Sequence, residues 1–517
     1  MKRRHFLRTT GSAVSIPVLL NGLSLSALAK PSIFNAVNND SDRVLVLIQL
    51  SGGNDGLNTV VPLDQYDNLQ NARSNIILPE SSILSLTDTV GLHPKMTGLK
   101  SLYDDGRLGI VQSVGYPNQN RSHFRSIEIW TSGSSTEEYL STGWIGRALD
   151  KRYPGFPEGF PNSDHPDPFA ISMGYSVSET CQGSAANYSM TLNDPFSLTT
   201  LAEGENDDTT SIYGQELAYL NATIAQTNAY ADQILSSAES GNNLGNYPDT
   251  ELGEQLRNVA LLISGGLKTK VYTVTLGGFD THANQVEGGN VTQGKHGELL
   301  ETLSEAIHAF QEDLQQQGLE ERVIGMTFSE FGRQIRSNGS HGTDHGAAAP
   351  LILFGSCVNP QILGDTPEIP NQVEVQDALP MQYDFRDIYG SILMDWFEMS
   401  VIDVKKILHD GVQYLPIVSA CGSTVSGQNL QTEIPIEMHC YPNPFQRWTN
   451  IRFTCETEWV RLSIFDSLGS EVRILTNKQL YAGEHKVAFD ASGLPPGNYF
   501  YRLQLGHRQK TKRMVKV

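Results

Sequence analysis

The middle of the chain alternates short apolar runs with longer segments of helical periodicity. Residues 43–50 (RVLVLIQL) form a continuous apolar run, which is typical of a strand buried on both faces of a parallel sheet. The same reasoning predicts strands at 108–114, 271–276, 323–327 and 351–354, and helices at 121–130, 216–236, 252–263, 299–314 and 388–397. Strand and helix in alternation predict an α/β domain with a mostly parallel sheet sandwiched by helices.

The pattern changes near residue 411. A small, polar stretch follows, and we expect a linker over 411–435. Short segments of alternating polarity then occur between turns rich in Gly and Pro, at 451–453, 460–465, 472–475, 486–489 and 499–505. Strands of this length and spacing predict a second, small all-β domain with an Ig-like sandwich fold.

The N-terminus has the pattern of an export signal. A basic stretch, MKRRHFLR, precedes an uncharged segment that closes on Ala27-Leu28-Ala29. We therefore expect an export signal over residues 1–29. Arg3-Arg4-His5-Phe6-Leu7 resembles the twin-arginine motif, whose pathway carries folded proteins; the alternative is an ordinary signal with two arginines.

Composition restricts the partners. The formal net charge is −20, and basic residues cluster at the two ends, so nucleic acid is not an expected partner. The acidity fits a solvated surface or cation binding. The 5 cysteines show no metal-type spacing; Cys440 and Cys455 either pair across two strands or remain free thiols.

Polar clusters follow the predicted strands of the large domain. They are Asp55, Ser122-His123, Asp280-Thr281-His282 and Asp344-His345. In parallel sheets, sites form at the carboxyl ends of strands. Carboxylate and imidazole ligands together suit Zn, whereas carboxylates alone suit Mg, Ca or Mn. Each cluster also has a structural interpretation: a tight turn for Asp55, a helix N-cap for Ser122, hydrogen-bonding loops for the others, and an internal ion pair for Glu330 and Arg333.

Several longer motifs extend these clusters. They are LIQLSGGNDGLNTVVP, GLHPKM, NRSHFRSIEIWTSG, TLGGFDTHANQ, FSEFGRQIRSNGSHGTDHGAAAPLILFG and DFRDIYGSILMDWF. Together they resemble the domain-of-unknown-function family numbered 1501, over a domain that we place at 42–410. That family is similar to the alkaline phosphatase and sulfatase superfamily, so the resemblance implies an alkaline phosphatase-like fold.

The resemblance also implies roles for single residues. Asp55 would be the first metal-binding Asp, and Ser122 would occupy the nucleophile position at a helix start. Asp280 and His282 would bind one divalent metal ion, and Asp344 and His345 the other. The sequence departs from the superfamily in two ways: Asp280 and His282 are two residues apart instead of four, and no well-placed further His follows His345. His123, His296, His341 or Glu330 could complete the site. An incomplete site would mean one metal ion, altered chemistry, or no metal.

The C-terminal domain carries a resemblance of its own. Its motifs are YPNPF at 441–445, IFDSLG at 464–469, GNYFYRL at 497–503 and the basic ending KTKRMVKV. They resemble the C-terminal sorting domain of the type IX (Por) secretion system over residues 436–517; the alternative is an Ig-like carbohydrate-binding or adhesion module. The resemblance implies passage through the periplasm to the cell surface or the medium, with export machinery at the inner and outer membranes as partners.

Two functions fit these expectations. The first is a metal-dependent hydrolase of phosphate or sulfate esters, in which Ser122 attacks and Arg121 or Arg125 holds the oxyanion. The second is a non-catalytic surface protein that uses the same fold to bind a glycan or another exported protein.

Overall fold

The computed structural model describes residues 42–202, 211–419, 421, 438–455, 458–466, 471–481, 483–505 and 508–517. The predicted export signal, residues 1–29, lies outside these ranges, as does most of the predicted linker. The chain divides into two compact units, Met1–Ser423 and Thr424–Val517. None of the helices in the described ranges has the length and apolar character needed to cross a bilayer.

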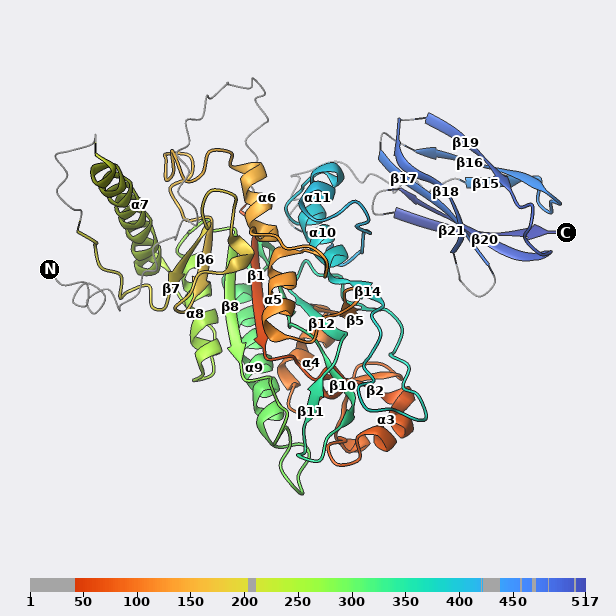
Figure 1. Ribbon diagram of the computed structural model, residues 1–517, viewed down its shortest axis with the longest axis horizontal. Coiled ribbons are helices and arrows are strands. Elements are labelled where there is room, and N and C mark those ends of the chain that lie inside the picture. Colours follow the sequence, from red (N-terminus) through yellow and green to blue (C-terminus); the bar gives the residue numbers. More distant parts are fainter. Residues whose placement is uncertain are drawn as a thin grey trace. The chain divides into compact units, whose positions relative to one another are not determined.

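The first unit is built on a mixed sheet (Figure 1). Its strands in spatial order are β13 (Ile362–Leu363), β5 (Leu108–Gly115), β12 (Ala349–Phe354), β9 (Val323–Phe328), β1 (Val44–Ser51), β8 (Val271–Gly277), β6 (Ala170–Met173) and β7 (Ser189–Leu192), with β14 (Tyr383–Asp384) paired to β5. The sheet is mostly parallel, but β12 runs antiparallel to both β5 and β9. The predicted strands at 43–50, 108–114, 271–276, 323–327 and 351–354 are confirmed.

Helices cover both faces of this sheet, as the sequence predicts. One group consists of α4 (Thr97–Asp104), α7 (Ile212–Ser240), α8 (Glu251–Ser264) and α9 (Lys295–Gln316); the other consists of α5 (His123–Ser132), α6 (Trp144–Arg152), α10 (Phe385–Asp395) and α11 (Val401–Ile407). Alternate residues of β1 separate the two cores: Val44, Val46 and Ile48 pack in the core of the first group, and Leu45 and Leu47 in that of the second. This period of two explains the uninterrupted apolar run, because a central strand needs apolar side chains on both faces.

Smaller elements lie around the sheet. They are the three-stranded sheet of β2 (Val60–Pro62), β4 (Val90–Leu92) and β3 (Leu84–Ser85), the hairpin β10 (Arg333–Ser337) and β11 (Thr343–His345), the helices α2 (Gly56–Thr59) and α3 (Tyr66–Ala72), and four 3-10 turns at Leu63–Gln65, Glu80–Ser82, Glu179–Cys181 and Glu320–Arg322 among the described residues.

The end of the first unit is packed more firmly than its composition suggests. Leu415, Ile417 and Val418 are buried in the core of the α5–α6–α10 face. A disulfide joins Cys357 to Cys421, and the Ser419 amide donates to the Cys357 carbonyl at 2.8 Å. The described part of the segment predicted as a linker therefore packs into the first unit.

The second unit is all-β, as predicted. One antiparallel sheet contains β15 (Met438–Tyr441), β16 (Trp448–Cys455) and β19 (Gly483–Asp490); the other contains β18 (Glu471–Leu480), β17 (Glu458–Phe465), β20 (Gly497–Leu505) and β21 (Arg508–Lys516). Their apolar faces form one core that includes Ile451, Leu462 and Tyr501. No disulfide joins Cys440 to Cys455 in the described residues, so of the two alternatives for this pair the one without a disulfide holds.

Candidate metal centre

Four chain segments meet at one edge of the large sheet. β8 and β9 are parallel to β1, so the loops that follow these three strands leave the sheet on the same side. β5 runs in the same direction, because it and β9 are both antiparallel to β12. The loop after β5 leads into α5 there, and the hairpin β10–β11 follows β9 directly. The strand directions thus bring the polar clusters of the sequence to one edge.

Imidazole nitrogens surround one oxygen of Asp280. The Oδ1 atom lies 3.1 Å from His282 Nε2, 3.2 Å from His345 Nε2 and 3.6 Å from His123 Nε2. His282 Nε2 and His345 Nε2 are 2.9 Å apart. Four ligands of a tetrahedral ion, each about 2 Å from it, lie about 3.3 Å from one another. The ligand atoms of His123, Asp280 and His345 all lie within 4.8 Å of one another and could hold a single metal ion, with His282 beside Asp280 and His345. We call His123, Asp280, His282 and His345 the histidine cluster.

The other nitrogen of each ring has an acceptor nearby. His282 Nδ1 donates to Asp344 Oδ1 at 2.7 Å, and His345 Nδ1 donates to the Arg121 carbonyl at 2.8 Å. His123 Nδ1 lies 3.7 Å from Glu330 Oε1. A neutral imidazole that donates from Nδ1 has a bare lone pair on Nε2. Two such lone pairs at 2.9 Å repel each other unless a cation lies between them, and fixing Nδ1 in this way is how metal sites orient histidine.

Charge in the cluster favours ligation. Burial lowers the pKa of His345, an effect larger than the opposing one of its bond to the Arg121 carbonyl, so the ring is neutral near pH 7. Partial burial acts to raise the pKa of Asp280, but the hydrogen bonds from Arg333 and His345 and the charges of Arg333 and His282 together outweigh it, and the pKa falls to about 2. Neutral imidazoles beside an ionised carboxylate are the protonation states that a divalent cation requires.

Glu330 and Arg333 bond to the loops that carry the cluster and do not pair with each other. Glu330 accepts from the Gly52 amide at 2.9 Å and from the Gly53 amide at 3.1 Å. The fully buried Arg333 donates to Asp280 Oδ1 at 2.8 Å and to the Thr343 carbonyl at 3.0 Å. The predicted ion pair between Glu330 and Arg333 is thus replaced by separate bonds to the loops after β1 and β8.

The glycine pair after β1 makes this arrangement possible. Gly52 and Gly53 have φ of 122° and 84°, in the region that favours glycine. A Cβ on Gly53 would lie 2.4 Å from the Phe331 ring. That ring in turn stacks near His345, with centroids 4.5 Å apart. The two glycines therefore let the first loop approach the floor of the histidine cluster.

Asp55 lies in a different environment. It is 1% exposed, and its two oxygens lie 3.0 and 2.9 Å from Arg73 Nη1. Gln285 Nε2 donates to Oδ2 at 2.6 Å. Burial acts to raise the pKa of Asp55, but Arg73 and the neighbouring groups outweigh it and the pKa is lowered. A buried guanidinium and the Gln285 amide already bond this carboxylate, and the metal-ligand role that the family resemblance implies for Asp55 stays a prediction.

Asp344 and the residues around Ser122 complete the site. Asp344 bonds through Oδ1 to His282 and, at 3.3 Å, to Asn338 Nδ2. Ser122 is exposed and occupies the N-cap position of α5 without a capping bond from its side chain. Arg121 donates to the Gln376 side chain at 3.0 Å. Ser122 is therefore flanked by two residues that contact the cluster: Arg121 through its carbonyl, and His123.

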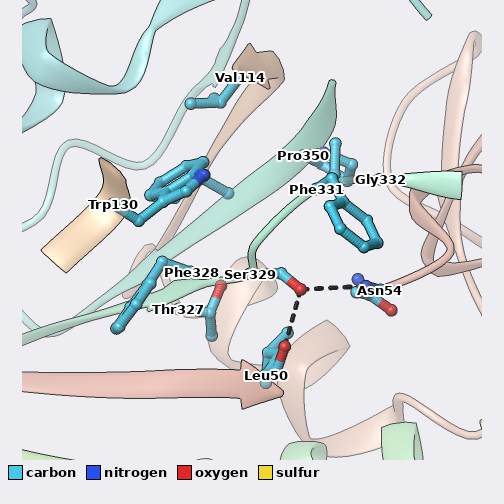
Figure 2. A pocket seen from close by; sticks show the side chains of 12 residues that line it. Leu50, Asn54, Val114, Trp130, Thr327, Phe328, Ser329, Phe331, Gly332 and Pro350 are labelled. Atoms are coloured by element: carbon cyan, nitrogen blue, oxygen red, sulfur yellow. Dashed lines mark hydrogen bonds between the residues drawn. The ribbon is translucent and has the colours of Figure 1, made fainter. Parts of the chain in front are cut away.

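A small pocket adjoins the cluster without containing it. Figure 2 shows the Ser329 hydroxyl between the Leu50 carbonyl and the Asn54 amide, at 2.7 and 3.0 Å. The pocket is lined by Leu50, Asn54, Val114, Trp130, Thr327, Phe328, Ser329, Phe331, Gly332, Ala349, Pro350 and Leu351. Trp130 Nε1 donates to the Glu330 carbonyl at 3.0 Å. The pocket thus lies within the packing that fixes the Ser329–Gly332 loop, and none of its lining residues belongs to the histidine cluster.

The sequence predicts several of these residues at one edge of the sheet, but it does not predict all of them. It indicates His123 only as a substitute ligand and gives no role to Arg73. The signal for His123 is its place directly after Ser122 at a helix start. No sequence signal joins Arg73 to Asp55, because they lie 18 positions apart and the segment between them has no fixed periodicity.

Fold and site together define an exported α/β protein with a candidate metal centre. Residues 42–394 match the model of the family described as a protein of unknown function (DUF1501), and the chain belongs to this family. Residues 439–517 match the secretion system C-terminal sorting domain. The protein is therefore exported through the type IX system, to the cell surface or into the medium. No curated protein matches the chain in sequence.

Solved structures that match are of low similarity. A protein in the alkaline phosphatase superfamily from Vibrio parahaemolyticus is 10% identical, with a TM-score of 0.30, over 91% of this chain and 79% of that one. A putative sulfatase from Bacteroides fragilis is 8% identical, with a TM-score of 0.29, over 90% and 92%. The surface component PorZ of the type IX system of Porphyromonas gingivalis is 18% identical, with a TM-score of 0.12, over 16% and 11%. At these scores the matches support no inference about activity.

Proposed function

We propose that this protein is a hydrolase of phosphate or sulfate esters that uses a single divalent metal ion. The ligands are Nε2 of His123, His282 and His345, and Oδ1 of Asp280. One observation carries the proposal: His282 and His345 both donate from Nδ1, so their Nε2 lone pairs face each other at 2.9 Å beside an anionic carboxylate. A bound cation removes that repulsion.

The environment of Asp55 supports one ion instead of two. Its oxygens are bonded to the buried Arg73 and to Gln285. The Arg73 guanidinium therefore supplies, next to Asp55, the positive charge that a second metal ion would supply. Asp344 acts on His282 Nδ1 and orients that ring. In this proposal Asp280, His282 and His345 keep the metal-ligand role expected from the sequence, His123 joins them, and Asp55 and Asp344 take supporting roles.

The chemistry follows from Ser122. Its Oγ attacks the phosphorus or sulfur of the ester, the bond to the leaving oxygen breaks, and the leaving alcohol carries away the hydroxyl proton. Water then releases the phosphate or sulfate and restores the serine. The bound cation supplies Lewis acidity and positive charge at Asp280. Of the two arginines beside Ser122, Arg121 is the one proposed to hold a substrate oxygen: among the described residues it donates to Gln376 alone, whereas Arg125 donates to the carbonyls of Ser135, Thr136 and Glu138.

A specific observation also favours the non-catalytic alternative. With His282 as the fourth ligand, the chain would supply a complete tetrahedral shell, as in structural metal sites, whereas catalytic sites keep one position open. The side chain of Asp280 is nevertheless 49% exposed, so the cluster is accessible to water and to a substrate. Both functions therefore include a bound metal ion, and only the hydrolase would turn over an ester.

The test measures both. Metal content is determined on the purified full-length chain, together with hydrolysis of aryl phosphate and aryl sulfate. We expect about one metal ion per chain. His345→Ala should lose metal and activity, whereas Ser122→Ala should lose activity and keep the metal. The matched control is His308→Ala, which removes a histidine of α9 outside the cluster.

Three results would contradict the proposal in different ways. Metal retained by His345→Ala would refute the ligand set. Bound metal without turnover of either ester would favour the non-catalytic function. Turnover that survives Ser122→Ala would remove Ser122 as the nucleophile.

A further inference from the structure

An unusually exposed aromatic ring lies next to the candidate centre. Phe124, in the first turn of α5, is 88% exposed, although it directly follows His123 of the histidine cluster. Phe124 and Ser122 are two residues apart, so their Cα atoms lie within about 7 Å of each other. Single exposed apolar residues are common on protein surfaces and need no function. The surroundings of this ring decide its meaning.

A second exposed aromatic residue is held beside the start of α5. The Arg125 guanidinium lies 3.7 Å from the centroid of the Tyr139 ring and donates to the Thr136 carbonyl at 3.0 Å. Thr136 Oγ1 donates in turn to the Pro117 carbonyl at 2.8 Å. Tyr139 is 73% exposed despite this stacking. The loops before and after α5 are therefore fixed against each other, with an aromatic face toward solvent.

The other flank of Ser122 has a similar composition. Arg121 donates to the side chain and to the carbonyl oxygen of Gln376, both at 3.0 Å. Val375, next to Gln376, is 65% exposed. We call Phe124, Tyr139 and Val375 the apolar rim. Within the rim, a guanidinium and an amide lie beside Ser122, so apolar faces and hydrogen-bonding groups occur together, as in sites for polar ring compounds.

We propose that the apolar rim binds the ring of the substrate's leaving group, with Phe124 as the residue that stacks on it. This inference rests on the proposed function, since it places the ester group at the histidine cluster and Ser122. The substrate class is then an ester whose leaving group contains a ring with a flat apolar face, such as a pyranose or an aryl group. Aromatic side chains stack on such faces, and Arg121 and Gln376 can bond to ring substituents.

The test compares two esters that differ in the ring alone. Glucose 6-phosphate and sorbitol 6-phosphate have the same six carbons and the same primary ester, but sorbitol has no ring; the 6-sulfates serve if sulfate is the ester hydrolysed. We expect Phe124→Ala to lower kcat/KM about 10-fold for the glucose ester and less than about 2-fold for the sorbitol ester. Phe124→Trp should restore the preference. Phenyl phosphate distinguishes the sources: a loss confined to it would identify an aryl substrate.

The matched control is an exposed aromatic residue far from the rim. Tyr175 is 78% exposed and follows β6, which lies five strand positions from β5 in the sheet. At about 4.8 Å per strand, the separation is roughly 24 Å. Tyr175→Ala should leave kcat/KM unchanged for all three esters.

A second readout separates this inference from the proposed function. Phe124→Trp places an indole in the rim, and its fluorescence relative to wild type should change and saturate with the ring compounds but not with the acyclic ester. If wild type hydrolyses nothing while this signal appears, the hydrolase proposal fails and ring binding stands. The rim inference is overturned if Phe124→Ala lowers both six-carbon esters equally, if it lowers no ester, or if neither turnover nor the fluorescence signal is seen.

Discussion

The loops after β1 and β8 each present an aspartate at the same edge of the sheet, but the two carboxylates have different partners. Asp55, after β1, is bonded to Arg73 and Gln285 and is 1% exposed. Asp280, after β8, meets three imidazoles and Arg333, and its side chain is 49% exposed. Their charges are similar, since the pKa of each is lowered. Each is paired with a buried guanidinium, and what differs is the rest of the surroundings: Asp55 is fully buried with Arg73, whereas the half-exposed Asp280 faces three imidazoles in addition to Arg333.

The comparison shows how one position after a strand supports either structure or chemistry. A permanently charged, buried guanidinium binds each carboxylate in the folded state: Arg73 binds Asp55, and Arg333 binds Asp280. Neutral imidazoles keep a lone pair for a metal ion. Asp55 therefore joins the loop after β1 to the Arg73 region, whereas Asp280 also faces three imidazoles that could share a metal ion with it.

The largest expected effect breaks the Asp55 ion pair. Arg73→Met leaves a buried, uncompensated carboxylate, and we expect the free energy of unfolding to fall by about 3–5 kcal/mol. The folded fraction should still bind one metal ion, because neither residue belongs to the histidine cluster. Urea denaturation measures the first effect and metal analysis the second. The control is Lys100→Met, which removes an exposed pair with Asp104 and should cost about 0–1 kcal/mol. Loss of metal from folded Arg73→Met would place Asp55 in the metal centre after all.

An intermediate effect is expected from Asp344. Its Oδ1 accepts from His282 Nδ1 at 2.7 Å, so Asp344→Asn keeps the shape and loses the charge that fixes this tautomer. Substitutions of such orienting groups weaken metal binding about 10- to 100-fold. Competition with a chelator of known affinity measures the change. Asp64→Asn, at an exposed position of the Leu63–Gln65 turn, should not change metal affinity. Complete loss of metal in Asp344→Asn would instead make Asp344 a direct ligand.

The two loops also show how far sequence reasoning reaches. The strands around them were predictable, because apolar runs such as 43–50 and 323–327 leave few alternatives to buried strands. Their shared edge was predictable from parallel order, which brought Asp280, His282 and His345 together. The partner of each carboxylate was not, because Arg73 reaches Asp55 only through the tertiary packing of α3 against β10. For the same reason the supporting roles of Glu330 and Asp344 follow from the folded structure alone.

A third carboxyl sharpens the comparison, because it has neither kind of partner. Asp387 on α10 accepts from the Gln413 amide at 2.7 Å, while its neighbour Arg386 is bonded to Asp384 at 2.6 Å. Burial raises the pKa of Asp387 to about 7, and the charge of Asp384 adds to this. A carboxyl whose pKa is raised on folding stabilises the protein fully below its unfolded pKa of about 4, and this contribution is lost as pH rises toward 7.

Asp387→Asn should remove this pH dependence and keep the acceptor for Gln413. Between pH 5 and pH 8 we expect wild type to lose about 1–2 kcal/mol of stability that the variant retains, after allowance for partial solvent access. Urea denaturation at the two pH values measures the difference, and Asp88→Asn, at an exposed position, should behave like wild type. Equal losses in wild type and Asp387→Asn would show that Asp387 is already ionised at pH 5. Burial without a cation would then not be enough to neutralise a carboxyl in this protein. The ionisation of Asp55 would in that case depend less on the charge of Arg73.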